Sequence, residues 1–324
     1  MNEPTNGPTP GQTPGPGPAP AWKAQRERGT QFMLRFLLGM ARLLGRRVTR
    51  ALALPPTTLY FLLTASDARR ASREFLSRVQ GHPASLAQVA RHIWTFASVI
   101  FDRMTMAIEG FSGLQLEEHR QAGETAVTYG ARRGSLLFVS HLGSFEALRL
   151  IGVERAPMKF LVDREHSQLL MKTLGKLAPR LAESIIDTGQ PGPALVLAVR
   201  QALDEGYRVG LMVDRYKAGE KTVRAPFFGG EAAFPAGPWA LAAALQARVM
   251  LAFCVFRGGD RYEGHFEVFE EKLVLARGAR EAGIEGCVRR YAARLEHHAR
   301  SAPYNWFNFY DFWKPAASNE AAPH

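Results

Sequence analysis

Cysteine is scarce in this sequence, and the few cysteines present are not paired. The 324 residues include only Cys254 and Cys287, which are far apart and have no C-x-x-C partner. This spacing excludes a disulfide framework and is typical of a reducing, cytoplasmic compartment. Cys254 lies in an apolar run, which predicts an ordinary position in the core.

The sequence has fewer acidic than basic residues, and it lacks the common nucleic-acid-binding motifs. Lys and Arg total 41 against 30 Asp and Glu, a net charge of +11. A strongly basic chain suits nucleic acid, an anionic lipid surface or an acidic protein. The sequence has no zinc-finger spacing, no RNP-like aromatic motif and no evident helix-turn-helix, so we expect no nucleic-acid partner. An anionic lipid surface and an acidic protein are therefore the expected partners.

The chain divides into four parts by composition. Residues 1–21 alternate Pro, Gly, Thr and Ala with almost no charge, which predicts a disordered tail. No basic start precedes an apolar core there, so this is not a signal peptide. We expect a helical, membrane-associating part over 22–110, an α/β domain over 111–315 and a flexible tail over 316–324.

Long uninterrupted apolar runs are also lacking at the N-terminal side. From Trp22 to Leu63 apolar and basic residues interleave, and Arg35 and Arg42 interrupt the roughly 20 apolar residues that a spanning helix needs. We expect Pro55 and Pro56 to stop the next apolar run. The pattern predicts an interfacial helix with its arginines on lipid phosphates, and residues 23–50 as the membrane-binding segment. An amphipathic helix packed on its own domain is the alternative.

The rest of the chain alternates helical and strand patterns. We expect helices over 66–79, 85–104, 117–133, 192–205, 239–246 and 284–300. We expect strands over 114–116, 136–139, 159–162, 184–187, 207–213, 249–256 and 266–269, the last at the edge of a sheet. The aromatic segment 303–315 is expected to pack back on the sheet, and a wall for the acyl chain is the alternative. This alternation predicts an α/β fold with a mostly parallel sheet flanked by helices.

The most informative stretch is 135–149, which has the pattern of a buried strand, a tight loop and the first turn of a helix. His141 follows the strand, at the carboxyl end where open α/β sheets place their ligands. Gly143 allows a sharp turn, and Glu146 falls in the first helical turn. We expect the imidazole to turn back toward this carboxylate and to act as a general base. Such a pair alone is a weak signal, because it is common by chance.

The segment from His141 to Glu146, His-Leu-Gly-Ser-Phe-Glu, resembles the H-x4-[D/E] signature of the lysophospholipid or glycerolipid acyltransferase superfamily. The chain is most similar to the late lipid A (lauroyl/myristoyl) acyltransferases. Pro226-Phe-Phe-Gly229 also resembles a turn of that family. Departures in the C-terminal aromatic block resemble the branch found with polyene and pigment lipid pathways. No G-x-S-x-G nucleophile elbow competes with this interpretation.

The resemblance implies roles for further residues. Arg164 stands where the family has an arginine after its second strand, and Asp214 matches the aspartate of its third motif. Arg215 departs from the glutamine usual there. We therefore expect Arg164, Asp214 and Arg215 to position phosphate or donor, and Phe228 and Gly229 to line the site.

The resemblance also implies a reaction. A fatty acyl group would move from a thioester of acyl carrier protein, or of CoA, to a hydroxyl of a lipid or glycolipid acceptor. The acceptor would be of the lipid A type or a polyene lipid. His141 would be the base and Glu146 its partner, with no cofactor and no metal. The expected location is the cytoplasmic face of the bacterial inner membrane, peripheral or N-terminally anchored. A lipid thioesterase or hydrolase, and a non-catalytic membrane-binding protein, are the alternatives.

Overall fold

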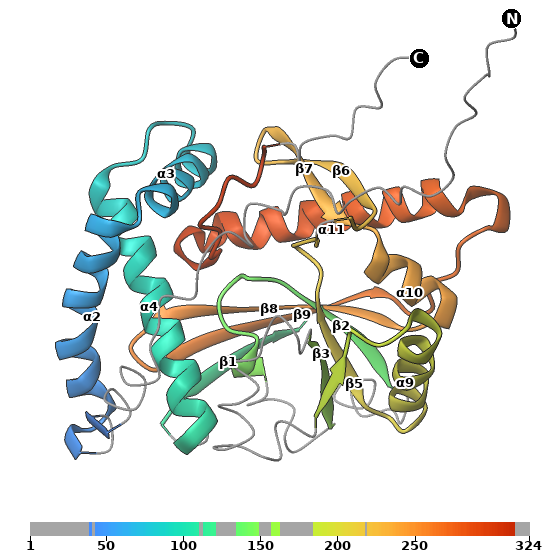
Figure 1. The fold of residues 1–324 in the computed structure, drawn as a ribbon, viewed down its shortest axis with the longest axis horizontal. Helices are drawn as coiled ribbons and strands as arrows, with labels where there is room; N and C mark the ends of the chain where they lie inside the picture. The colour runs from blue at the N-terminus through green and yellow to red at the C-terminus, as the bar shows by residue number, and fades with distance from the viewer. Residues whose placement is uncertain are drawn as a thin grey trace, which may run out of the picture.

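The centre of the molecule is a seven-stranded sheet. The structure is a computed structural model that describes residues 39–40, 43–109, 113–120, 134–148, 157–162, 184–217 and 219–314. The strand order is β1-β9-β8-β2-β5-β3-β4 (Figure 1). The strands are β1 Gln115–Arg120, β2 Ser135–Val139, β3 Met158–Val162, β4 Ile185–Asp187, β5 Arg208–Met212, β8 Val249–Gly258 and β9 Arg261–Glu270. A separate hairpin pairs β6 Thr222–Phe227 with β7 Gly230–Pro235.

Five neighbouring strands of the sheet run parallel. They are β8, β2, β5, β3 and β4. β9 is antiparallel to β8, and β1 is parallel to β9. The expected α/β class with a mostly parallel sheet is therefore confirmed.

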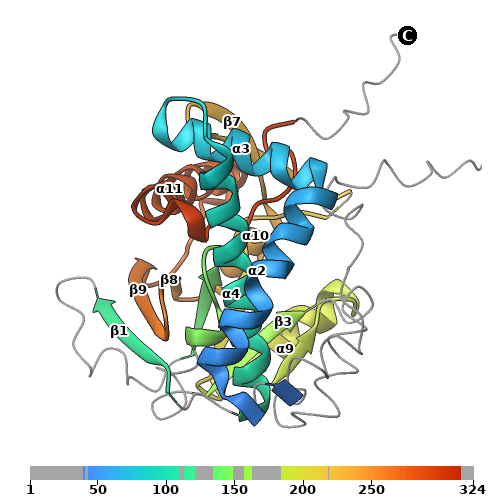
Figure 2. The same cartoon turned by 90° about the vertical axis from the view of Figure 1, so that its left-hand side faces the viewer.

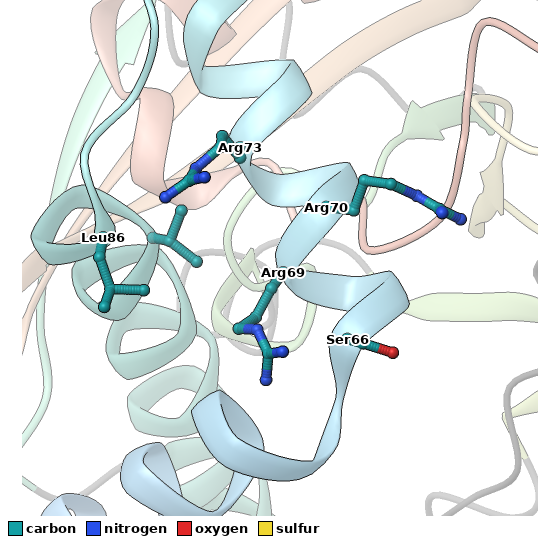
Figure 3. A pocket seen from close by; sticks show the side chains of 6 residues that line it. Ser66, Arg69, Arg70, Arg73 and Leu86 are labelled. Atoms are coloured by element: carbon teal, nitrogen blue, oxygen red, sulfur yellow. The ribbon is translucent and has the colours of Figure 1, made fainter.

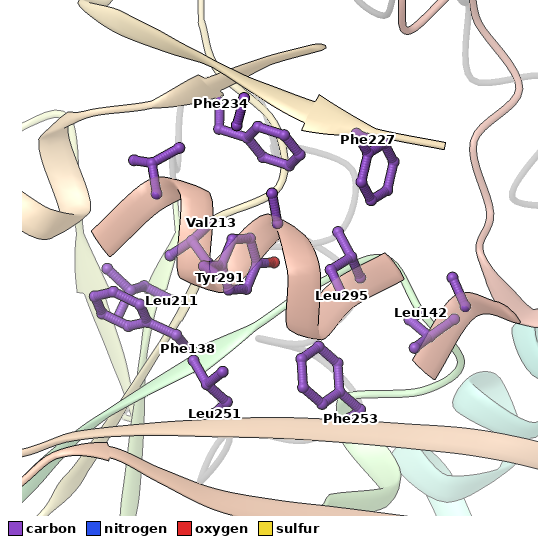
Figure 4. Packing of buried hydrophobic residues seen from close by; sticks show 14 of the residues in the cluster. Phe138, Leu142, Leu211, Val213, Phe227, Phe234, Leu251, Phe253, Tyr291 and Leu295 are labelled. Carbon is purple, nitrogen blue, oxygen red and sulfur yellow. The ribbon is translucent and has the colours of Figure 1, made fainter. Parts of the chain in front are cut away.

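Helices cover both faces of the sheet (Figures 1 and 2). Their bounds are α2 Arg46–Thr64, α3 Ser66–Gln80, α4 Leu86–Glu109, α9 Gly192–Asp204, α10 Gly237–Leu245 and α11 Arg280–Ser301. Successive side chains of a strand point to opposite faces. Leu136 and Phe138 of β2 accordingly join one buried cluster with α11, and Leu137 and Val139 join another with α4. Figure 4 shows the first cluster, with Tyr291 and Leu295 of α11.

Most elements form where the hydrophobic pattern predicts them. Helices α3, α4, α9, α10 and α11, and strands β2, β3, β4, β5 and β8, lie within a few residues of their expected bounds. β8 is buried over its first eight residues, as expected for a continuous apolar run that is covered on both faces. The C-terminal aromatic segment packs on the core, because Trp306, Phe307, Phe312 and Trp313 are all buried.

Two predictions at this side of the sheet were wrong, one of a helix and one of an edge strand. The helix expected from 117 to 133 begins with β-structure, since β1 continues to Arg120 and pairs with β9; residues 121–133 lie outside the described part. Pairing with a neighbouring strand overrides the weak local helical preference of a polar segment. The strand expected at the edge, β9, lies between β1 and β8. Its alternating pattern comes from one polar face, on which Glu267 binds Arg294 and His298 of α11.

Helix α2 continues through Pro55 and Pro56, which were expected to interrupt it. A proline in a helix leaves the carbonyl four residues earlier without its partner. Ala51 and Leu52, which carry those carbonyls, are exposed, so water can satisfy them. Most of the segment 23–50 lies outside the described residues. Among those described, no helix is both long enough and apolar enough to cross a membrane.

Arg46 and Arg50, expected on lipid phosphates, instead point inward. Both form ion pairs with Asp102 of α4, which is fully buried; the Arg46 Nη2–Asp102 Oδ1 distance is 3.0 Å. Tyr262 of β9 donates its hydroxyl to the other oxygen of Asp102 at 2.6 Å. A buried carboxylate needs such counter-charges and donors. This network fastens α2 to α4 and to the sheet.

Candidate active site

His141 and Asp214 meet because their strands are neighbours in register. β2 and β5 are parallel, with Val139 opposite Met212, so the residues two positions further on leave the sheet at the same level. The Val213 amide donates to the Val139 carbonyl at 3.0 Å, which extends the pairing past the strand ends. Ligand sites of open α/β sheets lie at this carboxyl edge.

Asp214 holds both the ring and the backbone of His141. Its Oδ1 lies 2.9 Å from Nδ1 of the imidazole, and its Oδ2 accepts the His141 backbone N–H at 2.9 Å. A carboxylate can only accept, so Nδ1 carries the proton and Nε2 keeps its lone pair. The Asp214 side chain is buried, whereas that of His141 is 28% exposed. The imidazole therefore has a fixed tautomer and a free basic nitrogen.

The loop that carries His141 is clamped between β8 and the C-terminal segment. The Ser144 amide donates to the Cys254 carbonyl, and the Gly143 amide donates to the Asn305 carbonyl, both at 2.8 Å. The Phe307 amide returns a bond to the His141 carbonyl at 2.9 Å. Gly143 has φ +70°, and a Cβ there would lie 1.7 Å from the Cys254 oxygen. Only glycine fits this position.

The side chain of Asn305 extends the clamp to the backbone of β8. It accepts the Phe256 amide at 2.6 Å and donates to the Phe256 carbonyl at 3.1 Å. From the other side, His92 of α4 lies 3.0 Å from the Trp306 carbonyl through Nε2 and 2.8 Å from the Ser72 hydroxyl through Nδ1. Burial lowers the pKa of His92 to about 4, so this bridge is neutral at pH 7.

The hydrogen bond expected between Glu146 and His141 is made by Asp214 instead. Glu146 begins the short 3-10 helix η2, Glu146–Leu148, and its carboxylate forms an ion pair with Arg103 of α4. It also accepts the Ser144 hydroxyl at 3.2 Å. Burial raises the pKa of Glu146, and the charge of Arg103 opposes that shift. The prediction that Glu146 orients the ring was wrong, because β5 brings a closer carboxylate to Nδ1.

Comparison with known proteins shows the family of this chain. Residues 79–315 match the model of a family described as bacterial lipid A biosynthesis acyltransferase, which covers well over half of the 324 residues. The chain belongs to this family. No curated protein sequence matches it. The family resemblance expected from the His141 segment is confirmed, and the chain is an acyltransferase of the lipid A type rather than a non-catalytic membrane-binding protein.

Two guanidinium groups of the acyltransferase, those of Arg215 and Arg103, act electrostatically on the imidazole of His141. Arg215 donates through Nη2 to the Phe307 carbonyl at 2.6 Å and lies 5.3 Å from the centroid of the Tyr310 ring. Burial lowers the pKa of His141, the charge of Arg215 lowers it further, and Asp214 acts in the opposite direction. Arg103 also contributes to the lowering. The net shift is downward, so His141 is a neutral base at pH 7.

The charge state of Asp214 follows from the same contacts. Burial would raise its pKa, but the charge and hydrogen bond of His141, together with the charge of Arg215, outweigh burial and lower it. The carboxylate therefore stays ionised opposite a ring that takes up a proton.

Three further residues were expected at the site: Arg164, Phe228 and Gly229. Arg164 is outside the described residues. Phe228, at the turn between β6 and β7, is only 3% exposed and its ring centroid lies 5.5 Å from that of Phe75. Its backbone N–H donates to Glu296 at 2.6 Å. Phe228 therefore supports the C-terminal segment from inside the core rather than lining an open surface, and Gly229 completes the turn with φ +71°.

Sequence reasoning missed Arg103 of the acyltransferase. Asp102 and Arg103 are the two charged residues in the apolar stretch 93–108, and this isolation was the available signal. Charges within an otherwise apolar helix face need partners. Asp102 pairs with Arg46 and Arg50, and Arg103 pairs with Glu146 beside the loop that carries His141.

One group of side chains in the described part of the chain could hold a metal ion. Glu117, His119 and Glu263 place one ligand atom each within 4.8 Å of one another on β1 and β9. Glu263 already binds Arg257, with an Nε–Oε2 distance of 2.7 Å, and Glu117 is exposed. A cation would compete with that guanidinium for Glu263, and the group includes neither His141 nor Asp214.

Proposed function

We propose that this acyltransferase moves a fatty acyl group from an acyl-carrier-protein thioester, or from acyl-CoA, to a hydroxyl of a membrane lipid acceptor. The acceptor is a lipid A-type glycolipid or a polyene lipid, met at the cytoplasmic face of the bacterial inner membrane. The single observation that carries the proposal is the His141–Asp214 pair, which leaves a neutral Nε2 at the carboxyl edge of the sheet. The family match sets the class of reaction.

The geometry supports direct transfer without an acyl-enzyme. Nε2 of His141 takes the proton of the acceptor hydroxyl while that oxygen attacks the thioester carbonyl carbon. Asp214 stabilises the imidazolium that forms. When the carbon–sulfur bond breaks, the thiolate leaves and recovers the proton from His141. The product ester and the free thiol account for all atoms, and no metal takes part in this scheme.

Positive charge beside the base suits the transition state. The attacked carbonyl oxygen becomes an anion in the tetrahedral intermediate, and fixed donors near such an anion are typically the largest contribution to catalysis. Arg215 is held beside the ring by the Phe307 carbonyl and the Tyr310 ring. We assign it to the acyl carbonyl, and Arg103 to fixing Glu146 next to the loop.

The test is acyl transfer by His141→Ala. A positioned general base typically raises the rate by about 10²–10⁴-fold, so kcat of this variant should fall by at least about 10²-fold. The assay follows the acylated lipid by mass spectrometry, with acyl carrier protein and CoA donors in parallel. Arg289→Gln on the exposed face of α11 is the matched control. A His141→Ala protein with normal melting and near-normal transfer would end the mechanism.

A thioesterase would use the same pair on water, and the same assay separates it. The donor is incubated with and without a detergent-dispersed acceptor lipid. An acyltransferase yields the acyl lipid and little free fatty acid when acceptor is present. Free fatty acid at an equal rate with and without acceptor would identify a hydrolase.

A further inference from the structure

Helix α2 presents an exposed apolar face to solvent. Val48, Leu52, Leu59 and Leu63 are 48–71% exposed, and their spacing of four, seven and four residues places them on one side of the helix. Tyr60, at 52%, extends the face. Soluble monomers rarely expose contiguous apolar surface of this kind unless it binds something.

That face carries no charge. Between Val48 and Thr64 the one charged residue is Arg50, and its side chain is 12% exposed because it turns inward to Asp102. Arg46 turns the same way. Apart from Arg47 near its start, whose side chain is 88% exposed, the outer surface of α2 is therefore hydrocarbon and proline over most of its length. Figure 2 shows α2 in front of α4, on which it packs.

A cationic hollow adjoins the C-terminal end of this face. It has a volume of about 250 Å³ and is lined by Ser66, Arg69, Arg70, Arg73, Leu86 and Val89 (Figure 3). Arg69 donates to the Leu62 carbonyl, so this guanidinium is fixed where α2 ends. Leu86, from the start of α4, is 58% exposed and continues the apolar surface past the arginines.

The arginines of the hollow have little internal compensation. Arg70 lies 3.3 Å from Asp67, but both side chains are more than three-quarters exposed, and such pairs contribute little. Arg73 is exposed and makes no ion pair with any described residue. Arg69 uses one of its five N–H donors on Leu62. Three guanidiniums within five residues thus remain available to an anion.

We propose that the α2 face and the α3 hollow together dock on an anionic phospholipid bilayer. Helix α2 lies in the plane of the interface with its outer face among the acyl chains, and the hollow receives a headgroup phosphate. A bilayer presents hydrocarbon and phosphate side by side along its surface, which matches the order of these two features. A second copy of the chain, with its own net charge of +11, offers no such complement. The inference deepens the proposed membrane acceptor and rests on that function.

The test measures binding of the full-length protein to vesicles of phosphatidylcholine, with and without phosphatidylglycerol. The variants are Leu59→Glu/Leu63→Glu on α2 and Arg70→Gln/Arg73→Gln in the hollow. The matched controls are Leu197→Glu, 68% exposed on α9, and Arg289→Gln on α11. Full-length protein is needed because truncation of α2 would strip Asp102 of its arginines.

The expected pattern distinguishes the two features. The leucine pair should lower affinity for both vesicle types by tenfold or more. The arginine pair should lower affinity on the order of tenfold or more for phosphatidylglycerol vesicles alone, since each basic residue near an anionic surface strengthens binding severalfold. Both control variants should bind as the wild type does, and all variants should melt normally.

Two results would overturn the proposal. Vesicle binding unchanged in both double variants would place the membrane contact elsewhere in the chain. Concentration-dependent dimerisation that is lost in Leu59→Glu/Leu63→Glu, without vesicle binding by the wild type, would assign the face to a second copy. Failure of the proposed function is distinguishable: His141→Ala should bind vesicles normally, and both double variants should keep acyl transfer to detergent-dispersed acceptor.

Discussion

Both carboxylate oxygens of Asp214 accept hydrogen bonds from one residue, His141. Together they constrain its backbone position and its ring orientation. The backbone bond fixes where the residue stands, and the ring bond fixes which way the imidazole faces. A general base needs both, because proton transfer requires its nitrogen within hydrogen-bond reach of the substrate. Glu146 supplies neither constraint, since it binds Arg103 and Ser144.

We expect Asp214→Asn to lower kcat by on the order of 10²–10⁴-fold, because the amide no longer fixes the tautomer or balances the imidazolium. Glu146→Gln should lose much less, since the ring keeps its partner. The comparison is made by steady-state acyl transfer on variants with unchanged melting temperatures. The assignment of the ring partner fails if Glu146→Gln proves the more damaged enzyme.

The pH dependence of kcat/KM would test the electrostatics of the same site independently. In the proposed mechanism His141 must be neutral, so we expect activity to be lost as the pH falls through its pKa, which burial and Arg215 lower. Arg215 lowers that pKa, so Arg215→Gln should move the acidic limb of the kcat/KM profile to higher pH. Asp214 raises it, so Asp214→Asn should move the limb to lower pH. Shifts in one common direction would contradict this electrostatic account.

The position of His141 was predictable from sequence, whereas its partner was not. The local pattern of a short apolar run followed by polar residues and a glycine indicates where the strand ends, and His141 lies directly after that end. The meeting with Asp214 depends on β2 and β5 being neighbours in register, although 73 residues separate the two side chains in the chain. No local pattern encodes that pairing, so the nearer acid, Glu146, was the natural but incorrect choice.

At the scale of elements, α2 is held by charge at one end and exposes hydrocarbon along its outer side. Asp102 is the common partner of Arg46, Arg50 and the Tyr262 hydroxyl. Hydrophobic periodicity predicted the helices, but it cannot show which arginines turn inward. Hydrophobic periodicity also failed to predict the full length of β1, because its polar residues form a strand by pairing with β9.

Asp102→Asn is expected to destabilise the fold by about 3–5 kcal/mol, because removing one partner of a buried ion pair leaves the other uncompensated. Asp67→Asn is the matched control: its pair with Arg70 is exposed, so the loss should stay within about 1 kcal/mol. Urea unfolding measures both. Equal midpoints for the two variants would show that α2 is not fastened through Asp102.

At the scale of the whole molecule, the net charge of +11 suits the acidic carrier-protein donor proposed above. Long-range attraction raises association rates, and salt screens it. We expect kcat/KM with an acyl-carrier-protein donor to fall as ionic strength rises, while kcat changes little. Acyl-CoA, with far fewer charges, is the comparison substrate. If both donors serve equally and neither responds to salt, the carrier protein is not the preferred donor.

The clamp on the catalytic loop also bears on the biosynthesis of the enzyme. A ribosome delivers His141 and Asp214 long before it delivers Asn305 and Phe307, whose backbones bind the loop. A nascent chain therefore carries both members of the pair while the loop has no clamp. We therefore expect acyl transfer only from a chain that includes Asn305 and Phe307, and we expect a chain that ends before Asn305 to be inactive.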